Sequence, residues 1–142
     1  MAEVPSLAVV ADQVFDSADF VSIGTNDLAQ YTLAADRMAP DLADLADPWQ
    51  PALLRLIQMV GEAGEATGTP VGVCGEAAAD LALSAVLVGL GVSSLSMAAR
   101  AITPVGLRLA EADLATCRAA AAAAVAAPDA RGARDAARRL LG

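Results

Sequence analysis

The chain has 142 residues, the length of about one domain, and nine basic residues, all of them Arg, stand against 17 acidic ones for a net charge of −8. This balance excludes a typical nucleic-acid-binding protein, because such a protein needs a basic face to neutralise phosphates. The chain has no His, which excludes a catalytic histidine, a histidine metal site and a phosphohistidine within it.

The high mean hydropathy does not predict a membrane protein. About a quarter of the residues are the weakly apolar Ala, and no run of about 18 strongly apolar residues occurs. The first residues lack the basic start and apolar core of a signal peptide. Cys74 and Cys117 lie far apart and in no paired motif. We therefore expect a cytoplasmic protein with reduced thiols and no membrane partner.

Four short apolar or β-branched runs alternate with helical patterns. The predicted strands are residues 1–4, 19–23, 70–73 and 93–97, and the helical patterns between them cover residues 7–15, 51–67 and 80–90. Asp80 is a suitable N-cap for the last of these helices, and Gly89 and Gly91 favour its end. Strand and helix in alternation predict an α/β fold with a parallel sheet.

After residue 97 the alternation stops and helices remain. Pro104 is expected to start one helix, and Asp113 a second, Ala-rich one that runs through Ala127. Pro128 then breaks the chain before a short Arg-rich helix that closes at Leu140. We expect residues 1–142 to form one unit, with a half-barrel over 1–110 and a helical tail over 111–142.

Four βα units are half of a TIM-type (β/α)8 barrel. Such a half would leave two parallel edges and its inner face uncovered, whereas parallel sheets are normally covered on both faces. The first strand is also short, since Pro5 follows it almost at once. We therefore expect either the C-terminal part of a longer protein or a half-domain that assembles with another copy.

Polar residues follow directly on the second predicted strand. Gly24 allows a tight turn or a close approach to a ligand. Thr25, Asn26 and Asp27 then begin a helix, and the free N–H groups of such an end bind phosphate or carboxylate. The same three residues are also typical of an ordinary N-cap cluster.

A cysteine follows directly on the third predicted strand. Cys74 lies in the sequence Gly-Val-Cys-Gly-Glu, where the small neighbours allow a substrate to approach a thiol that acts as an acid, base or nucleophile. A buried structural cysteine is the alternative. Cys117, within the Ala-rich segment, is interpreted as structural.

Two carboxylates and one guanidinium complete the candidates. Glu3 and Asp27 follow adjacent parallel strands and could share a Mg²⁺ ion, which prefers oxygen ligands. Glu3 could equally be a solvated residue. Arg37 could grip a phosphate or carboxylate, or pair on the surface with Asp36 or Asp41.

In order and spacing, these segments resemble the C-terminal part of the phosphoenolpyruvate (PEP)-utilising enzymes. The resemblance is carried by residues 1–5, 22–37, 73–76 and 95–97. The continuation Gln-Tyr-Thr-Leu at residues 30–33 and the pair Ser-Met at 96–97 favour the Enzyme I branch, the PEP–protein phosphotransferases of the sugar phosphotransferase system.

The resemblance implies a role for each candidate. Glu3 and Asp27 are expected to bind Mg²⁺. Asn26, Asp27 and Arg37 are expected to contact PEP. Cys74 is expected to deliver a proton to enolpyruvate as pyruvate forms.

The family's phosphorylated histidine, its domain for the histidine-containing phosphocarrier protein and its first half-barrel have no counterpart in this chain. We therefore expect an Enzyme I-like C-terminal segment that does not complete a phosphotransfer alone. The alternative is a non-catalytic module for dimerisation or for pairing with a missing half. A remnant with no role is disfavoured, because all five candidate residues are present.

Overall fold

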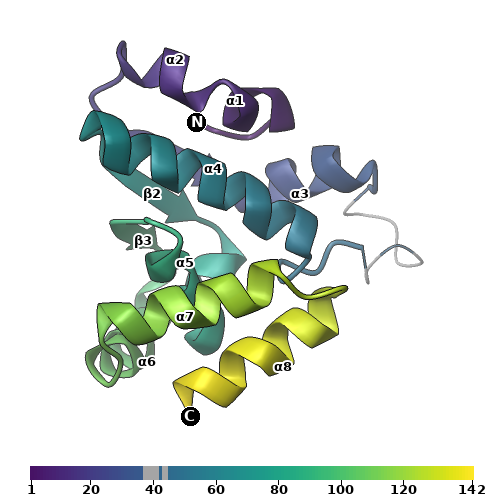
Figure 1. The fold of residues 1–142 in the computed structure, drawn as a ribbon, viewed down its shortest axis with the longest axis vertical. Helices are drawn as coiled ribbons and strands as arrows, with labels where there is room; N and C mark the ends of the chain where they lie inside the picture. The colour runs from purple at the N-terminus through teal and green to yellow at the C-terminus, as the bar shows by residue number, and fades with distance from the viewer. Residues whose placement is uncertain (37–41, 43–44) are drawn as a thin grey trace.

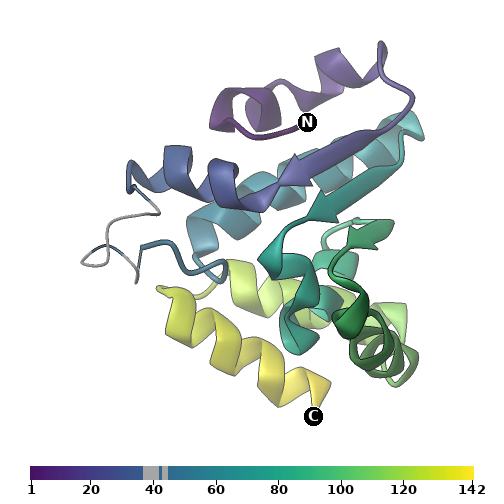
Figure 2. The same cartoon turned by 180° about the vertical axis from the view of Figure 1, so that it is seen from behind.

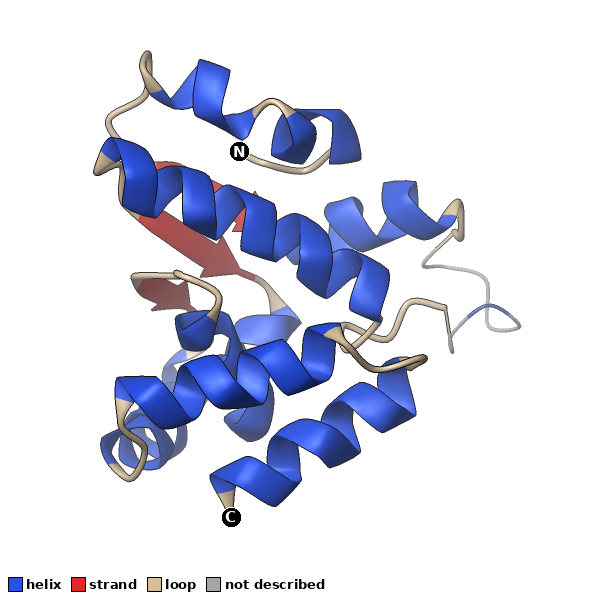
Figure 3. Cartoon of the chain, in the orientation of Figure 1, coloured by secondary structure: helices blue, strands red, loops and turns tan. Residues whose placement is uncertain are grey.

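The computed structural model describes residues 1–36, 42 and 45–142, and in it helices pack around a small parallel sheet (Figures 1 and 3). The elements in chain order are α1 (Pro5–Val9), α2 (Ala11–Phe15), β1 (Val21–Gly24), α3 (Thr25–Leu33), α4 (Pro51–Thr67), β2 (Val71–Cys74), the 3₁₀ helix η2 (Glu76–Ala79), α5 (Leu81–Gly89), β3 (Ser94–Ser96), α6 (Ala99–Ala110), α7 (Leu114–Val125) and α8 (Ala130–Leu141).

The strands are parallel and adjacent in chain order, β1-β2-β3. This confirms the α/β class and the parallel sheet. The expected first strand is reduced to a single parallel bridge between Ala2 and Ile23 of β1. The reason lies at Pro5, which begins α1 directly and has no N–H to extend a ladder.

The two faces of the sheet differ sharply. The face toward the helices is apolar and buried, with Val21, Ile23, Val71 and Val73 each less than a tenth exposed. Because side chains alternate along a strand, the other face carries the intervening residues. These are Ser22 and Gly24 of β1, Gly72 and Cys74 of β2, and Ser94 and Ser96 of β3.

Figure 2 looks onto this second face, with the strands in front of α4. A parallel sheet with helices on one face and small or polar residues on the other is consistent with a partial barrel.

Close backbone contacts hold the helical layer together. A Cβ on Gly61 of α4 would collide with the carbonyl of Leu90, and one on Gly89 of α5 with the carbonyl of Cys117 in α7. The Ala-rich segment is a packed helix, with Ala120 and Ala124 fully buried. Small side chains therefore let these helices approach closely.

Several helix boundaries differ from the predicted ones. The pattern over residues 7–15 forms two short helices, because Val10 leaves the helical conformation between them. Pro104 does not start a helix but lies inside α6, which begins at Ala99. The predicted helix over 51–67 is confirmed, and the N-caps Asp80 and Asp113 are confirmed by their hydrogen bonds to backbone N–H groups.

Among the described residues, none of the helices has both the length and the apolar character needed to cross a bilayer.

Candidate functional site

The carboxyl ends of the three strands meet at one edge of the sheet. Gly24 pairs with Cys74, and Cys74 with Ser96, so these residues lie side by side. The chain leaves β1 into the polar start of α3 and β2 into Gly75 and Glu76, and Arg100 is the one charged residue in the segment 97–100 that follows β3. In parallel α/β folds, this edge is where ligands bind.

Glu3 reaches this edge from the N-terminal segment. A Cβ built on Gly24 would stand 2.7 Å from both Cγ and Oε1 of Glu3, so the side chain occupies space that any larger residue at 24 would fill. The hydrogen bonds of Ala2 to Ser22 and Gly24 hold the segment in place, at 2.8 and 3.0 Å. The carboxylate therefore lies over the end of β1.

Asn26 and Asp27 lie in the first turn of α3. No side chain caps this helix at its N-cap, Gly24. The Thr25 hydroxyl donates instead to the carbonyl of Cys74, 3.2 Å away, and ties α3 to the end of β2. Asn26 is exposed and Asp27 half-buried. The Asn26 amide oxygen lies near Gly75, 3.6 Å from the position of a Cβ there.

Cys74 is half-buried, and its Sγ donates to the carbonyl of Ile23 on the neighbouring strand at 3.5 Å. This contact orients the thiol at the edge of the sheet. Gly75 follows with φ +110°, a conformation that favours glycine. Cys117 is different: it is buried under α5, and burial raises its thiol pKa, with the charge of Asp113 acting in the same direction. Its interpretation as structural agrees with this burial.

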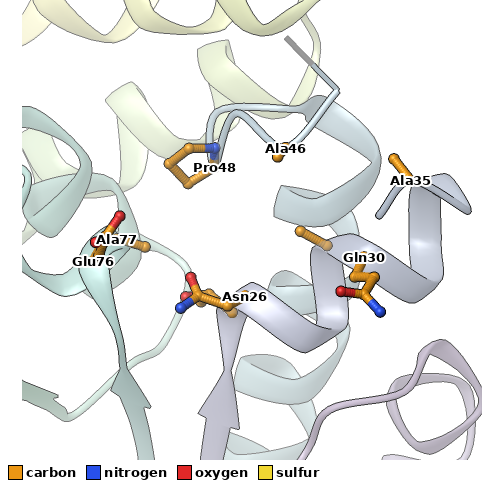
Figure 4. Close-up of a pocket in the computed structure, with 9 residues that line it drawn as sticks. Asn26, Gln30, Ala35, Ala46, Pro48, Glu76 and Ala77 are labelled. Carbon is orange, nitrogen blue, oxygen red and sulfur yellow. The ribbon is translucent and has the colours of Figure 1, made fainter. Parts of the chain in front are cut away.

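Two pockets open at this edge and share Asn26 and Glu76. The first has a volume of about 420 Å³ and lies between α3, η2 and the loop before α4 (Figure 4). It is lined by Thr25, Asn26, Ala29, Gln30, Ala35, Ala46, Pro48, Glu76 and Ala77. The second has a volume of about 590 Å³ and is lined by Asn26, Gly75, Glu76, Ala79, Ser96, Met97, Ala98 and Arg100.

The structure thus brings Glu3, Asn26, Asp27 and Cys74 to the same edge. Arg37, the predicted phosphate contact, lies outside the described residues. Within the ranges that the structure describes, no group of three or more His, Cys, Asp or Glu side chains converges as a metal site. A cation here would take one or two carboxylates from this chain, which is a common arrangement for Mg²⁺.

Three residues of the pockets with charged or amide side chains were not predicted as site residues: Gln30, Glu76 and Arg100. Glu76 and Arg100 each follow a predicted strand within a few residues, so the position after a strand end was the available signal. Gln30 lies one helical turn after Asn26 on α3, and helical periodicity alone places it on the same side. Arg100 is exposed in the first turn of α6.

Comparison with protein families decides the relationship. The model of the PEP-utilising enzymes, PEP-binding domain, matches residues 1–114. The chain belongs to this family. The predicted resemblance is therefore confirmed, and the pockets described above lie at the strand ends of a PEP-binding domain.

Two individual relatives are both named phosphoenolpyruvate-protein phosphotransferase. The chain is 54% identical over 141 residues to the phosphoenolpyruvate-protein phosphotransferase of Streptomyces coelicolor. The matched region covers 99% of this chain and 25% of that protein. It is 52% identical over 104 residues to the phosphoenolpyruvate-protein phosphotransferase of Bacillus subtilis, covering 73% of this chain and 18% of that protein. The chain thus spans a quarter or less of the length of these relatives.

Proposed function

We propose that this chain supplies the C-terminal half of a PEP-binding site in an enzyme of the PEP–protein phosphotransferase type. The observation that carries the proposal is the meeting of Glu3, Asn26 and Cys74 at one edge of a parallel sheet. A carboxylate, an amide and a thiol supply three different functions there: cation binding, phosphate contact and proton donation.

Glu3 and Asp27 are the proposed Mg²⁺ ligands. Their oxygens are the donors that Mg²⁺ prefers, and the missing side chain at Gly24 leaves the space in which the Glu3 carboxylate lies. When bound, Mg²⁺ would neutralise negative charge on the substrate phosphate during transfer.

The N-terminus of α3 is the proposed phosphate contact. Because the N-cap residue of α3 is Gly24, no side chain at that position competes with an anion for the first N–H groups of the helix. Asn26, exposed beside them, adds an amide donor. Arg37 is proposed as the cation on the same phosphate, because a guanidinium binds two phosphate oxygens at once. These groups would orient PEP at the carboxyl end of β1.

Cys74 is the proposed proton donor. Loss of the phosphoryl group from PEP leaves the enolate of pyruvate, whose methylene carbon must gain one proton. Transfer of the Sγ proton to that carbon forms the methyl group of pyruvate and leaves a thiolate, which water then reprotonates. The hydrogen bond from Sγ to the carbonyl of Ile23 supports this role, because it fixes the position of the thiol at the carboxyl ends of the strands.

The rest of the site would come from a preceding half of the barrel. Two features favour such a partner, since parallel sheets are normally covered on both faces: the face made of Ser22, Gly72 and Ser94, and the outer edge of β3, which pairs with no further strand in the part of the chain that the structure describes. In the complete enzyme, the phosphoryl group would pass to a histidine outside this chain and then to a histidine-containing phosphocarrier protein. The open face and edge equally favour the second candidate, a non-catalytic module for dimerisation or pairing.

Calorimetry tests the proposal directly. PEP would be titrated with Mg²⁺ into this chain, alone and mixed with a polypeptide that carries the preceding half-barrel of the Streptomyces coelicolor relative. We expect PEP to bind to the mixture. In the Glu3→Gln variant, the affinity of the mixture for PEP should fall about tenfold or more. The exposed Glu62→Gln, on α4, is the matched control. If the two polypeptides associate but the mixture binds no PEP, the result would favour the assembly module and overturn the enzyme proposal.

A further inference from the structure

Trp49 anchors the loop that precedes α4. Its side chain is fully buried, and its indole Nε1 donates to Oδ2 of Asp80 at 3.1 Å. The other oxygen of Asp80 accepts the N–H groups of Ala82 and Leu83, both at 2.9 Å. One carboxylate thus fixes both the indole and the start of α5.

A second carboxylate connects the same loop to α8. Nη2 of Arg134 donates to both oxygens of Asp47, at 3.1 and 3.0 Å. Oδ1 of Asp47 also accepts the backbone N–H of Trp49, at 3.0 Å. The Arg134 guanidinium lies 5.6 Å from the centre of the Trp49 ring, within the range of a cation–π contact. Arg134 therefore contacts both ends of the segment 47–49.

This segment forms part of the wall of the first pocket. Ala46 and Pro48, on either side of Asp47, line the pocket opposite Asn26 (Figure 4). The ion pair is partly shielded, with the side chains of Arg134 and Asp47 about a third and a quarter exposed. A shielded pair is screened less by solvent than an exposed one, so it can hold a loop in one position.

We propose that Arg134 is a positioning residue that clamps this wall of the pocket through Asp47 and Trp49. This inference depends on the proposed function in one respect, the identification of PEP as the ligand of the pocket. It assigns a role in the site to α8, which lies beyond residues 1–114, the part that the family model covers. Loss of the clamp would let the segment 47–49 move away from Asn26 and weaken ligand binding without touching the ligand.

The fluorescence of Trp49 tests the clamp, because it is the only Trp of the chain. Arg134→Gln removes the charge and keeps most of the side-chain length. In this variant, we expect the acrylamide quenching constant of Trp49 to rise about fivefold, because the segment 47–49 loses one ion pair and one cation–π contact. Arg134→Lys should restore most of the protection. Arg131→Ala, at an exposed Arg of the same helix, is the control and should match the parent chain.

A variant of Asp47 tests the same ion pair without changing α8, so that a folding defect of α8 cannot explain the result. Asp47→Asn keeps the acceptor for the Trp49 N–H but loses the charge that Arg134 contacts, so it should raise quenching in the same direction as Arg134→Gln, by a smaller amount because the cation–π contact remains. The double variant should add little to Arg134→Gln alone, since that single change already removes the ion pair with Asp47. Quenching that stays at the parent level in both single variants, or that rises equally in Arg131→Ala, overturns the clamp.

Titration with PEP and Mg²⁺, in the mixture with the preceding half-barrel, separates the clamp from the proposed function. We expect Arg134→Gln to bind about fivefold more weakly than the parent, in line with its quenching. Greater quenching with unchanged affinity would overturn the positioning role. If the parent mixture binds no PEP, the proposed function fails, and the quenching comparison by itself decides the clamp.

Discussion

The carboxylate of Glu3 lies over the backbone of Gly24, at a distance that leaves no room for a side chain at position 24. Two segments separated by about twenty residues therefore meet at the edge of the sheet where the candidate site lies. The absence of a side chain at Gly24 is as important for this arrangement as the presence of the acid.

Gly24→Ala should displace Glu3 and weaken binding of Mg²⁺. The φ of Gly24 is −88°, which Ala adopts without strain, so the fold should remain intact. The added Cβ would meet the Glu3 side chain, which must move away. Binding of Mn²⁺, as a paramagnetic substitute for Mg²⁺, would be measured by water proton relaxation in the mixture with the preceding half-barrel. Unchanged Mn²⁺ affinity in Gly24→Ala would argue against Glu3 as a ligand.

Gly89→Ala should destabilise the chain by about 1–3 kcal/mol, because its Cβ would collide with the backbone of α7. Gly106→Ala is the matched control. Its Cβ would meet nothing within 4 Å in α6, and replacing a helical Gly by Ala should stabilise by about 0.5–1 kcal/mol. Urea unfolding followed by circular dichroism would compare the two. Equal stability of the two variants would show that the contact between α5 and α7 is not tight in solution.

The two thiols should react at very different rates. Cys74 is half-buried at the open edge of the sheet, whereas Cys117 is 2% exposed. A thiol reagent should modify Cys74 first in the native chain, and Cys117 only in denaturant. Mass spectrometry of digests would locate the label, and Cys74→Ala should abolish the native reaction. Early labelling of Cys117 would contradict its burial between α5 and α7.

Burial of Cys117 also predicts a loss of stability in alkali. Burial raises the pKa of its thiol, so the folded state keeps the proton longer than the unfolded state does. Stability should therefore decline as the pH rises past the ordinary thiol value of about 8.5. Cys117→Ala should show a smaller decline between pH 8 and 10 in urea unfolding. An equal decline in both chains would assign the effect to other groups.

For Asp113 we predict a pH dependence of stability opposite in sign to that of Cys117: the stability that this carboxylate contributes is lost in acid. The backbone N–H of Thr116, 2.7 Å from its Oδ1, lowers the pKa of this carboxyl at the start of α7. Its contribution is present above the ordinary carboxyl pKa of about 4 and is lost as the pH falls through the lowered value. The stability advantage over Asp113→Asn, which keeps a cap without the charge, should shrink in acid. Asp135→Asn, at an exposed acid of α8, is the control.

Much of the fold follows from local patterns. The apolar runs around Ile23 and Val73 and the stripe of α4 each predict one element, because strand and helix periods are properties of a short window. Asp80 and Asp113 mark helix starts for the same reason. The break at Val10 and the inclusion of Pro104 within α6 were not predicted, since a local pattern locates helix boundaries less well than helix centres.

The sequence by itself determined that polar residues follow the second predicted strand and that a cysteine follows the third. Asn26, Asp27 and Cys74 then share one edge, because parallel strands bring their carboxyl ends to the same edge of a sheet. Only the tertiary structure decided that Glu3 lies over Gly24 and that Arg134 of the last helix contacts Asp47. Those contacts join segments distant in the chain, and they depend on how closely whole helices and loops approach, which no local period encodes.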